Sequence, residues 1–166
     1  MVELAIVGAK NSGKTTVIEG LVGYLVDKGC HVGTIKHTSH SHRFDAQGKD
    51  SYRHRQAGSI VTAAVSNEEI AIFAEPGVID TEQLRQMTRH QIDIWLIEGN
   101  RCSDLPKILV TRALREISDG LPNNIVATIG QERLADVAAH FEARDYKGLG
   151  EFVHRTMLDE KTEIHR

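Results

Sequence analysis

The sequence has 166 residues, a length typical of one domain, and 40% hydrophobic residues, enough to build a buried core. Its 23 acidic and 20 basic residues give a formal net charge of -3, which disfavours general binding to nucleic acids or to anionic membranes. The first residues carry no basic leader and no apolar stretch long enough to span a bilayer. We therefore expect a single domain over residues 1–166, located in the cytoplasm.

The N-terminal third predicts a strand, a helix and a second strand in direct succession. Residues 2–8 (VELAIVG) form an apolar run typical of a buried strand. The apolar spacing of residues 14–28 predicts a helix that Gly29 closes, and residues 31–37 (HVGTIKH) follow as a strand. This succession is typical of the right-handed crossover between two parallel strands.

The middle of the chain is less regular. Residues 38–58 are polar and predict a long functional loop, or at most a short helix. Residues 59–66 (SIVTAAVS) and 69–75 (EIAIFAE) predict two strands joined by a turn at Asn67 and Glu68. We expect this antiparallel hairpin to join the main sheet, which would make that sheet mixed.

The remaining elements alternate again. A helix is predicted at residues 81–90, a fully buried strand at 93–98 (DIWLIE), and further strands at 106–112 and 123–129. Residues 131–158 predict two amphipathic helices split near Gly148 and Gly150, the first with Leu134, Val137, Ala138 and Phe141 on one face.

A phosphate-binding loop lies between the first strand and the first helix. Residues 8–15 (GAKNSGKT) match the pattern G-x-x-x-x-G-K-[ST], whose small residues let backbone N–H groups surround phosphate oxygens at the positive end of a helix. Lys14 supplies a mobile charge, and Thr15 places a hydroxyl where Mg²⁺ would bind. The residues predicted to bind nucleotide are Gly8, Lys10, Asn11, Ser12, Gly13, Lys14, Thr15 and Thr16.

The loop and the order of elements together predict an α/β protein. The specific expectation is a three-layer P-loop NTPase fold, with a mostly parallel sheet and a β-hairpin extension.

An acidic residue is needed to hold the metal beside such a loop. Glu98 ends a buried strand and precedes Gly99, so it is predicted at the carboxyl edge of the sheet. Asp93 begins the same strand and is predicted at the opposite edge. Asp45 and Asp50 lie in the polar segment, where either could serve as a second carboxylate on the metal side, and spacing does not choose between them.

The polar segment also forms a local cationic patch in an acidic protein, which indicates an anionic ligand or partner. Its histidines could instead hold a metal, although they lack the spacing and the accompanying cysteines of a structural zinc site. Cys30 and Cys102 lie outside any CxxC pattern and are predicted to be free thiols. The histidines concerned are His37, His40, His42 and His54.

Four segments form a recognisable set: GAKNSGKTT at 8–16, TIKHTSH at 34–40, FDAQGKDSYRHRQAG at 44–58, and LIEGN at 96–100 followed by PKILVTR. With them the chain resembles the molybdopterin-guanine dinucleotide biosynthesis protein B family of bacterial molybdenum-cofactor maturation. Lys36-His37 and the block from Asp45 to Gly58 are more specific to that family than the phosphate loop. The resemblance runs to about Arg112, and Asn100 and Arg101 depart from the family's pattern.

The resemblance implies a GTP-binding protein with weak Mg²⁺-dependent hydrolysis, accessory to the guanylyltransferase that attaches GMP to molybdopterin. Its partners would be that transferase and molybdopterin, and it would form a homodimer. Lys14, Glu98 and Asp45 would be catalytic, and Thr15, Asp45 and Glu98 would hold Mg²⁺. Guanine selectivity rests on the resemblance, because the base-reading motif [NT]-K-x-D is missing.

Two alternatives remain open. The first is an ATP-dependent small-molecule kinase, in which the basic segment binds the acceptor and Asp45 or Asp50 positions its hydroxyl. The second is a binding module in which the nucleotide acts as a switch and the cationic segment docks a partner.

Overall fold

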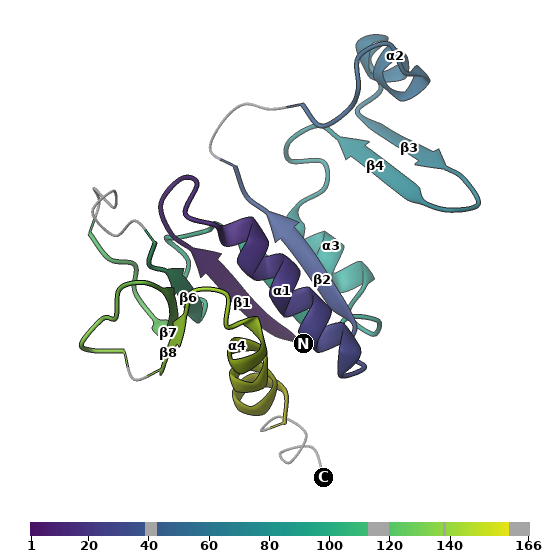
Figure 1. Ribbon diagram of the computed structural model, residues 1–166. Coiled ribbons are helices and arrows are strands. Elements are labelled where there is room, and N and C mark those ends of the chain that lie inside the picture. Colours follow the sequence, from purple (N-terminus) through teal and green to yellow (C-terminus); the bar gives the residue numbers. More distant parts are fainter. Residues whose placement is uncertain (39–42, 113–119, 138, 160–166) are drawn as a thin grey trace. The chain divides into compact units, whose positions relative to one another are not determined.

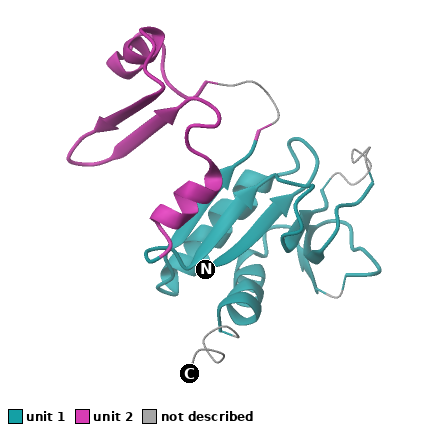
Figure 2. Ribbon diagram, turned by 180° about the vertical axis from the view of Figure 1, so that it is seen from behind, with its two compact units in different colours: residues 1–37, 90–166 teal, residues 38–89 magenta. Residues whose placement is uncertain are grey.

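The computed structural model describes residues 1–38, 43–112, 120–137 and 139–159. The chain divides into two compact units, one formed by residues 1–37 with 90–166 and the other by residues 38–89 (Figure 2). The second unit is thus inserted into the sequence of the first. That residues 1–166 form a single domain stays a prediction.

The first unit is built on a six-stranded sheet in which every pairing is parallel. Its strand order is β2-β5-β1-β6-β7-β8 (Figure 1). Because all strands run the same way, their carboxyl ends meet at one edge of the sheet, where α/β proteins bind ligands. The strands are β1 (Val2–Val7), β2 (Val32–Lys36), β5 (Ile94–Glu98), β6 (Lys107–Val110), β7 (Ile125–Gly130) and β8 (Ala139–Glu142).

Two helices pack on this sheet from one side. Helix α1 (Lys14–Asp27) contacts β1, β2 and β5, and helix α4 (Tyr146–Val153) packs against α1 (Figure 1). The core between them is apolar, and fully burying one such side chain contributes about 1.5–3 kcal/mol. It includes Leu21 and Leu25 of α1, Leu149 of α4, and Leu4 and Ile6 of β1. The α/β fold class is confirmed.

Helices α1 and α4 approach closely at two glycines. A Cβ atom on Gly20 would lie 2.4 Å from Cγ of Tyr146, and one on Gly150 would lie 2.4 Å from Cγ of Tyr24. Each helix therefore places a tyrosine over a glycine of the other. Gly148 and Gly150 lie inside α4, so the prediction that they split two helices was wrong. Glycine is unfavourable inside a helix, but here the stability gained from close packing compensates for its low helix propensity.

The predicted helix over the residues before α4 was also wrong. Strand β8 occupies residues 139–142 and pairs in parallel with β7. Ala139 and Phe141 both pack on the main core, which is the alternation of a strand. A short apolar run fits the period of a helix as well as that of a strand. Here the segment forms a strand because it pairs with the exposed edge of β7. Beyond α4 the chain continues as a π-helical segment, η2 (His154–Asp159).

The second unit contains α2 (Asp50–Gln56), β3 (Val61–Val65), β4 (Ile70–Ala74) and α3 (Thr81–Met87). Strands β3 and β4 form the predicted antiparallel hairpin, but they make their own two-stranded sheet. The expectation of a mixed main sheet was therefore wrong. The central strands β1, β5 and β6 of the main sheet are buried on both faces, whereas most residues of the hairpin are exposed.

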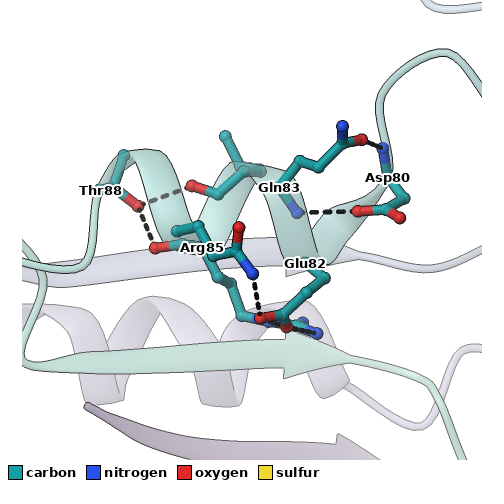
Figure 3. Close-up of polar contacts among 7 residues, drawn as sticks. Asp80, Glu82, Gln83, Arg85 and Thr88 are labelled. Atoms are coloured by element: carbon teal, nitrogen blue, oxygen red, sulfur yellow. Dashed lines mark hydrogen bonds and ion pairs between the residues drawn. The ribbon is translucent and has the colours of Figure 1, made fainter.

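Helix α3 shows how local sequence sets an element of the second unit. The Asp80 side chain accepts a hydrogen bond from the Gln83 N–H at 2.7 Å, and the Gln83 side chain accepts one from the Asp80 N–H at 2.9 Å (Figure 3). This reciprocal pair is a capping box. One turn further, Arg85 pairs with Glu82 at 3.1 Å. Both pairs are encoded by the spacing of these side chains along the helix.

Two smaller predictions concern the whole chain. Cys30 and Cys102 are both free thiols, as predicted, and burial raises the pKa of the Cys30 thiol. Among the described residues, none of the helices has the length and apolar character needed to cross a bilayer.

Candidate phosphate-binding site

The loop between β1 and α1 has the backbone that its glycines predict. Gly13 has a φ of 101° and Gly8 a φ of 154°, both in the region that favours glycine. A Cβ atom on Gly8 would also lie 2.8 Å from Ser12 Oγ and 2.9 Å from the Val110 carbonyl oxygen. The loop is therefore closed tightly around its own backbone, and side chains are excluded where a ligand would approach.

The N-terminal turn of α1 is open at this loop. Gly13 is the N-cap and provides no side-chain hydrogen bond, and the Val17 N–H bonds to the Gly13 carbonyl. The preceding N–H groups have no acceptor within the helix, so the turn carries partial positive charge. Ser12 Oγ is buried in the loop and has no hydrogen-bond partner among the described residues. Orphaned donors of this kind fit the oxygens of a bound phosphate.

Lys14 lies over the loop. Its ammonium donates hydrogen bonds to the Ala9 carbonyl at 2.6 Å and to the Gly8 carbonyl at 3.2 Å. Burial lowers the pKa of Lys14, the charge of Glu98 opposes this effect, and Lys36 adds to it. The lysine is thus a partly desolvated cation held by carbonyl groups. An anionic ligand would stabilise its charge better than these carbonyls do.

Thr15 and Glu98 meet at the carboxyl edge of the sheet, as predicted. The Thr15 hydroxyl donates to Glu98 Oε2 at 3.1 Å, and the Glu98 side chain is 14% exposed. Asp93, at the start of the same strand, accepts a hydrogen bond from the His31 N–H at 2.8 Å on the opposite edge. The strand thus separates its two acids, and only Glu98 reaches the loop.

Lys36 was singled out with His37 as a family signature, but its contact with Glu98 was not predicted. Its ammonium lies 3.2 Å from Glu98 Oε1, so Glu98 has Thr15 on one oxygen and a cation on the other. The signal was present in the register, because Lys36 and Glu98 are direct partners in the β2–β5 pairing. The contact can be predicted from the sequence only when β2 and β5 are known to be neighbours.

His37 is anchored at the same edge. Its N–H donates to the Glu98 carbonyl at 2.9 Å, and a Cβ atom on Gly99 would lie 3.2 Å from the His37 carbonyl oxygen. Two other histidines of the predicted cluster, His40 and His42, lie outside the described residues. Within the described part of the chain, no group of three or more His, Cys, Asp or Glu side chains could hold a metal ion.

Asp45 belongs to the second unit, whereas Thr15 and Glu98 belong to the first. Its side chain is 2% exposed, accepts a hydrogen bond from Ser51 Oγ at 2.9 Å, and lies 3.6 Å from Arg55 Nη1. Arg55 also pairs with Glu75 at 3.4 Å. Asp45 therefore joins the start of its unit to α2, whereas Asp50 is exposed. The metal-binding role of Asp45 stays a prediction.

A pocket of about 360 Å³ lies beside the loop, where β6, β7 and β8 end. Ser12, Gly13 and Thr16 form the wall shared with the phosphate loop. Arg112 and Arg144, both exposed, are among the residues of the other walls. The site therefore continues from the loop into a cationic hollow, of a size typical for small ligands.

Comparison with known proteins agrees with these features. The sequence model of the family described as molybdopterin guanine dinucleotide synthesis protein B matches residues 3–131. A molybdopterin-guanine dinucleotide biosynthesis adapter protein of Haemophilus influenzae is 37% identical over 121 residues, which are 72% of this chain and 67% of that protein. The adapter protein of the same description from Escherichia coli is 30% identical and covers 90% of each chain.

The fold is also found in a solved relative. The crystal structure of Bacillus subtilis MobB superposes with a TM-score of 0.77 at 25% identity, over 93% of this chain and 97% of that one. Because the family model spans the phosphate loop, Glu98 and the arginine that follows β6, the match includes the site itself. The chain belongs to the molybdopterin guanine dinucleotide synthesis protein B family.

Proposed function

We propose that this protein binds GTP with Mg²⁺ and hydrolyses it weakly, as an accessory to the attachment of GMP to molybdopterin. The observation that carries the proposal is the 3.1 Å hydrogen bond between Thr15 and Glu98. It joins a hydroxyl at the start of α1 to a carboxylate at the end of β5, beside a helix N-terminus and the ammonium of Lys14. Mg²⁺ prefers such oxygen ligands together with substrate phosphates.

Each residue of the site has a distinct part in this proposal. The backbone N–H groups of the loop bind phosphate oxygens, and Lys14 transfers its ammonium from loop carbonyls to phosphate. Thr15 and Glu98 hold the metal, which when bound neutralises charge on the phosphates. Before the metal binds, Lys36 keeps the Glu98 carboxylate paired. The guanylyltransferase and molybdopterin are the proposed partners, since the named relatives are adapter proteins of the same biosynthesis.

Calorimetric titration of the purified protein with GTP and with ATP, each with and without Mg²⁺, tests the proposal. We expect GTP to bind more tightly than ATP and Mg²⁺ to strengthen binding. Equal affinities would remove the base-specific part of the proposal. Preference for ATP would instead favour the ATP-dependent small-molecule kinase.

The Glu98→Gln variant tests the metal part separately. Without Mg²⁺ it should bind GTP at least as well as the wild type, because a negative charge near the phosphates is removed. With Mg²⁺ the gain in affinity should fall by about tenfold or more, since a metal-binding carboxylate is lost. Asp93→Asn is the matched control, because it neutralises the acid at the other end of the same strand. An unchanged Mg²⁺ response in Glu98→Gln would contradict the assignment.

We also propose a homodimer that uses the β3–β4 hairpin. One face of the hairpin is entirely apolar and largely exposed, with Val65 72%, Ile70 68% and Ile72 49% accessible. The opposite face carries Phe73. The Cζ atom of the Arg55 guanidinium lies 5.8 Å from the centre of the Phe73 ring. Within the described residues the two-stranded sheet pairs with no further strand, and such hairpins are marginally stable alone.

Light scattering coupled to gel filtration checks the dimer. The Ile70→Lys/Ile72→Lys variant should shift the protein from dimer to monomer, because two charges would be buried unpaired in the interface. Leu84→Lys, which alters a partly exposed leucine of α3, should leave the dimer intact. A wild-type protein that is monomeric at micromolar concentration would exclude this interface.

A further inference from the structure

The pocket beside the phosphate loop lies on the opposite side of β1 from Glu98. Strand β1 has β5 as one neighbour and β6 as the other. Glu98 ends β5, whereas the pocket is lined by residues at the ends of β6 and β7, including Val110 and Gly130. A nucleotide with its phosphates on the loop and its metal at Glu98 would therefore extend its base toward this pocket.

The pocket contains two arginines, whose side chains can only donate hydrogen bonds, beside hydroxyl and amide side chains that both donate and accept. Arg112 and Arg144 both line it, and the side chain of neither makes an ion pair or hydrogen bond with a residue that the structure describes. None of the described lining residues is an aspartate or glutamate. The neighbouring Asp145 is engaged elsewhere, since its carboxylate accepts the Gly148 N–H at 3.0 Å as the N-cap of α4.

This donor set matches one edge of guanine. The N1 and N2 groups of guanine are donors, and the described lining has no carboxylate to accept from both of them. The O6 and N7 atoms are both acceptors, and an arginine fits them with two parallel hydrogen bonds. Adenine presents N7 as an acceptor but an amino group in place of O6, so the same arginine would face a donor.

We infer that, if the proposed GTP binding holds, this pocket selects guanine through O6 and N7, with Arg112 and Arg144 as the specificity-determining residues. The side chain of Tyr146 forms part of the same pocket and is held in place against Gly20. The missing [NT]-K-x-D motif is then explained by a different mode of reading. Guanine is read by cations on its O6–N7 edge, and no carboxylate is required.

Base analogues distinguish the two modes of reading. Inosine triphosphate lacks the N2 amino group but keeps O6 and N7, so it should bind within about twofold of GTP. The 7-deaza analogue of GTP lacks only the N7 acceptor and should bind about tenfold more weakly. Affinities are measured by calorimetry in Mg²⁺ with the full chain.

Variants assign the effect to the arginines. The Arg112→Met/Arg144→Met double variant should bind GTP and ATP within about twofold of each other. Methionine keeps the length and apolar stem of arginine, and circular dichroism checks that the variant is folded. Arg133→Met is the control, because it removes an exposed arginine two residues beyond Gln131, which lines the pocket.

The outcomes separate this inference from the proposed function. Strong loss of inosine triphosphate binding with normal 7-deaza-GTP binding would overturn the inference and indicate an acceptor that reads N2. Equal binding of GTP, inosine triphosphate and ATP would also overturn it, while leaving the phosphate site intact. If no triphosphate binds the wild type, the proposed function itself fails.

Discussion

Replacing Lys14 with methionine is expected to lower the affinity for GTP by about tenfold to a hundredfold, because hydrogen bonds to charged groups contribute about 1.5–3 kcal/mol. The ammonium now rests on the carbonyls of Gly8 and Ala9, and a phosphate would give it anionic acceptors instead. Methionine retains most of the side-chain stem, so the loss should come from the charge. Calorimetry with Mg²⁺ and GTP measures it.

Lys28→Met is the control for this variant. Lys28 lies just past the other end of α1, with its ammonium 5.5 Å from the Tyr24 ring centre. Its removal should leave GTP affinity unchanged, since it carries the same charge but is remote from the loop. Wild-type affinity in Lys14→Met would defeat the assignment of residues 8–15 as a phosphate site.

The second large effect is on stability. The Gly20→Ala variant should lower the free energy of unfolding by about 2 kcal/mol, within the range typical of overpacked cores. The added Cβ would lie 2.4 Å from Cγ and 2.8 Å from Cβ of Tyr146, close to the backbone of α4, where the ring cannot move away cheaply. Urea denaturation followed by circular dichroism measures the change.

Gly23 provides a matched control in the same helix. No atom lies within 4 Å of the position that its Cβ would occupy. Gly23→Ala should therefore raise the free energy of unfolding by about 0.5–1 kcal/mol, because alanine favours helix. If Gly20→Ala raised the free energy of unfolding as Gly23→Ala does, α4 would not pack on Gly20. Gly20→Ala should cost less in a Tyr146→Ala background than in the wild type, since the two residues interact directly.

The parts of the fold that sequence predicted are those with strong local signals. Residues 4–7 and 94–97 are unbroken apolar runs, and both became part of buried central strands. The loop glycines and Thr15 were placed by a motif with a mechanical cause, and Glu98 by its position at a strand end. The capping box of Asp80 and Gln83 likewise needs only local spacing.

The parts that sequence missed depend on distant neighbours. Strand β8 exists because β7 offers it an edge, and Gly150 sits within a helix because Tyr24 packs on it. Lys107 was read as part of an ordinary strand, yet it is fully buried and donates to the Leu105 carbonyl and to Asn123 Oδ1, both at 2.9 Å. In each case the residue that determines the local structure lies elsewhere in the chain. The periodicity of the local sequence therefore cannot reveal it.

The contact between Lys36 and Glu98 makes the edge of the sheet electrically balanced before any ligand arrives. Because the ammonium occupies one carboxylate oxygen at 3.2 Å, a metal bound to both oxygens of Glu98 would have to displace it. Metal uptake would then be an exchange of one cation for another. The displaced lysine, which is 58% exposed, would be released next to the incoming phosphates. In a site of this kind the arriving ion takes over the carboxylate and frees the lysine's charge for the phosphates.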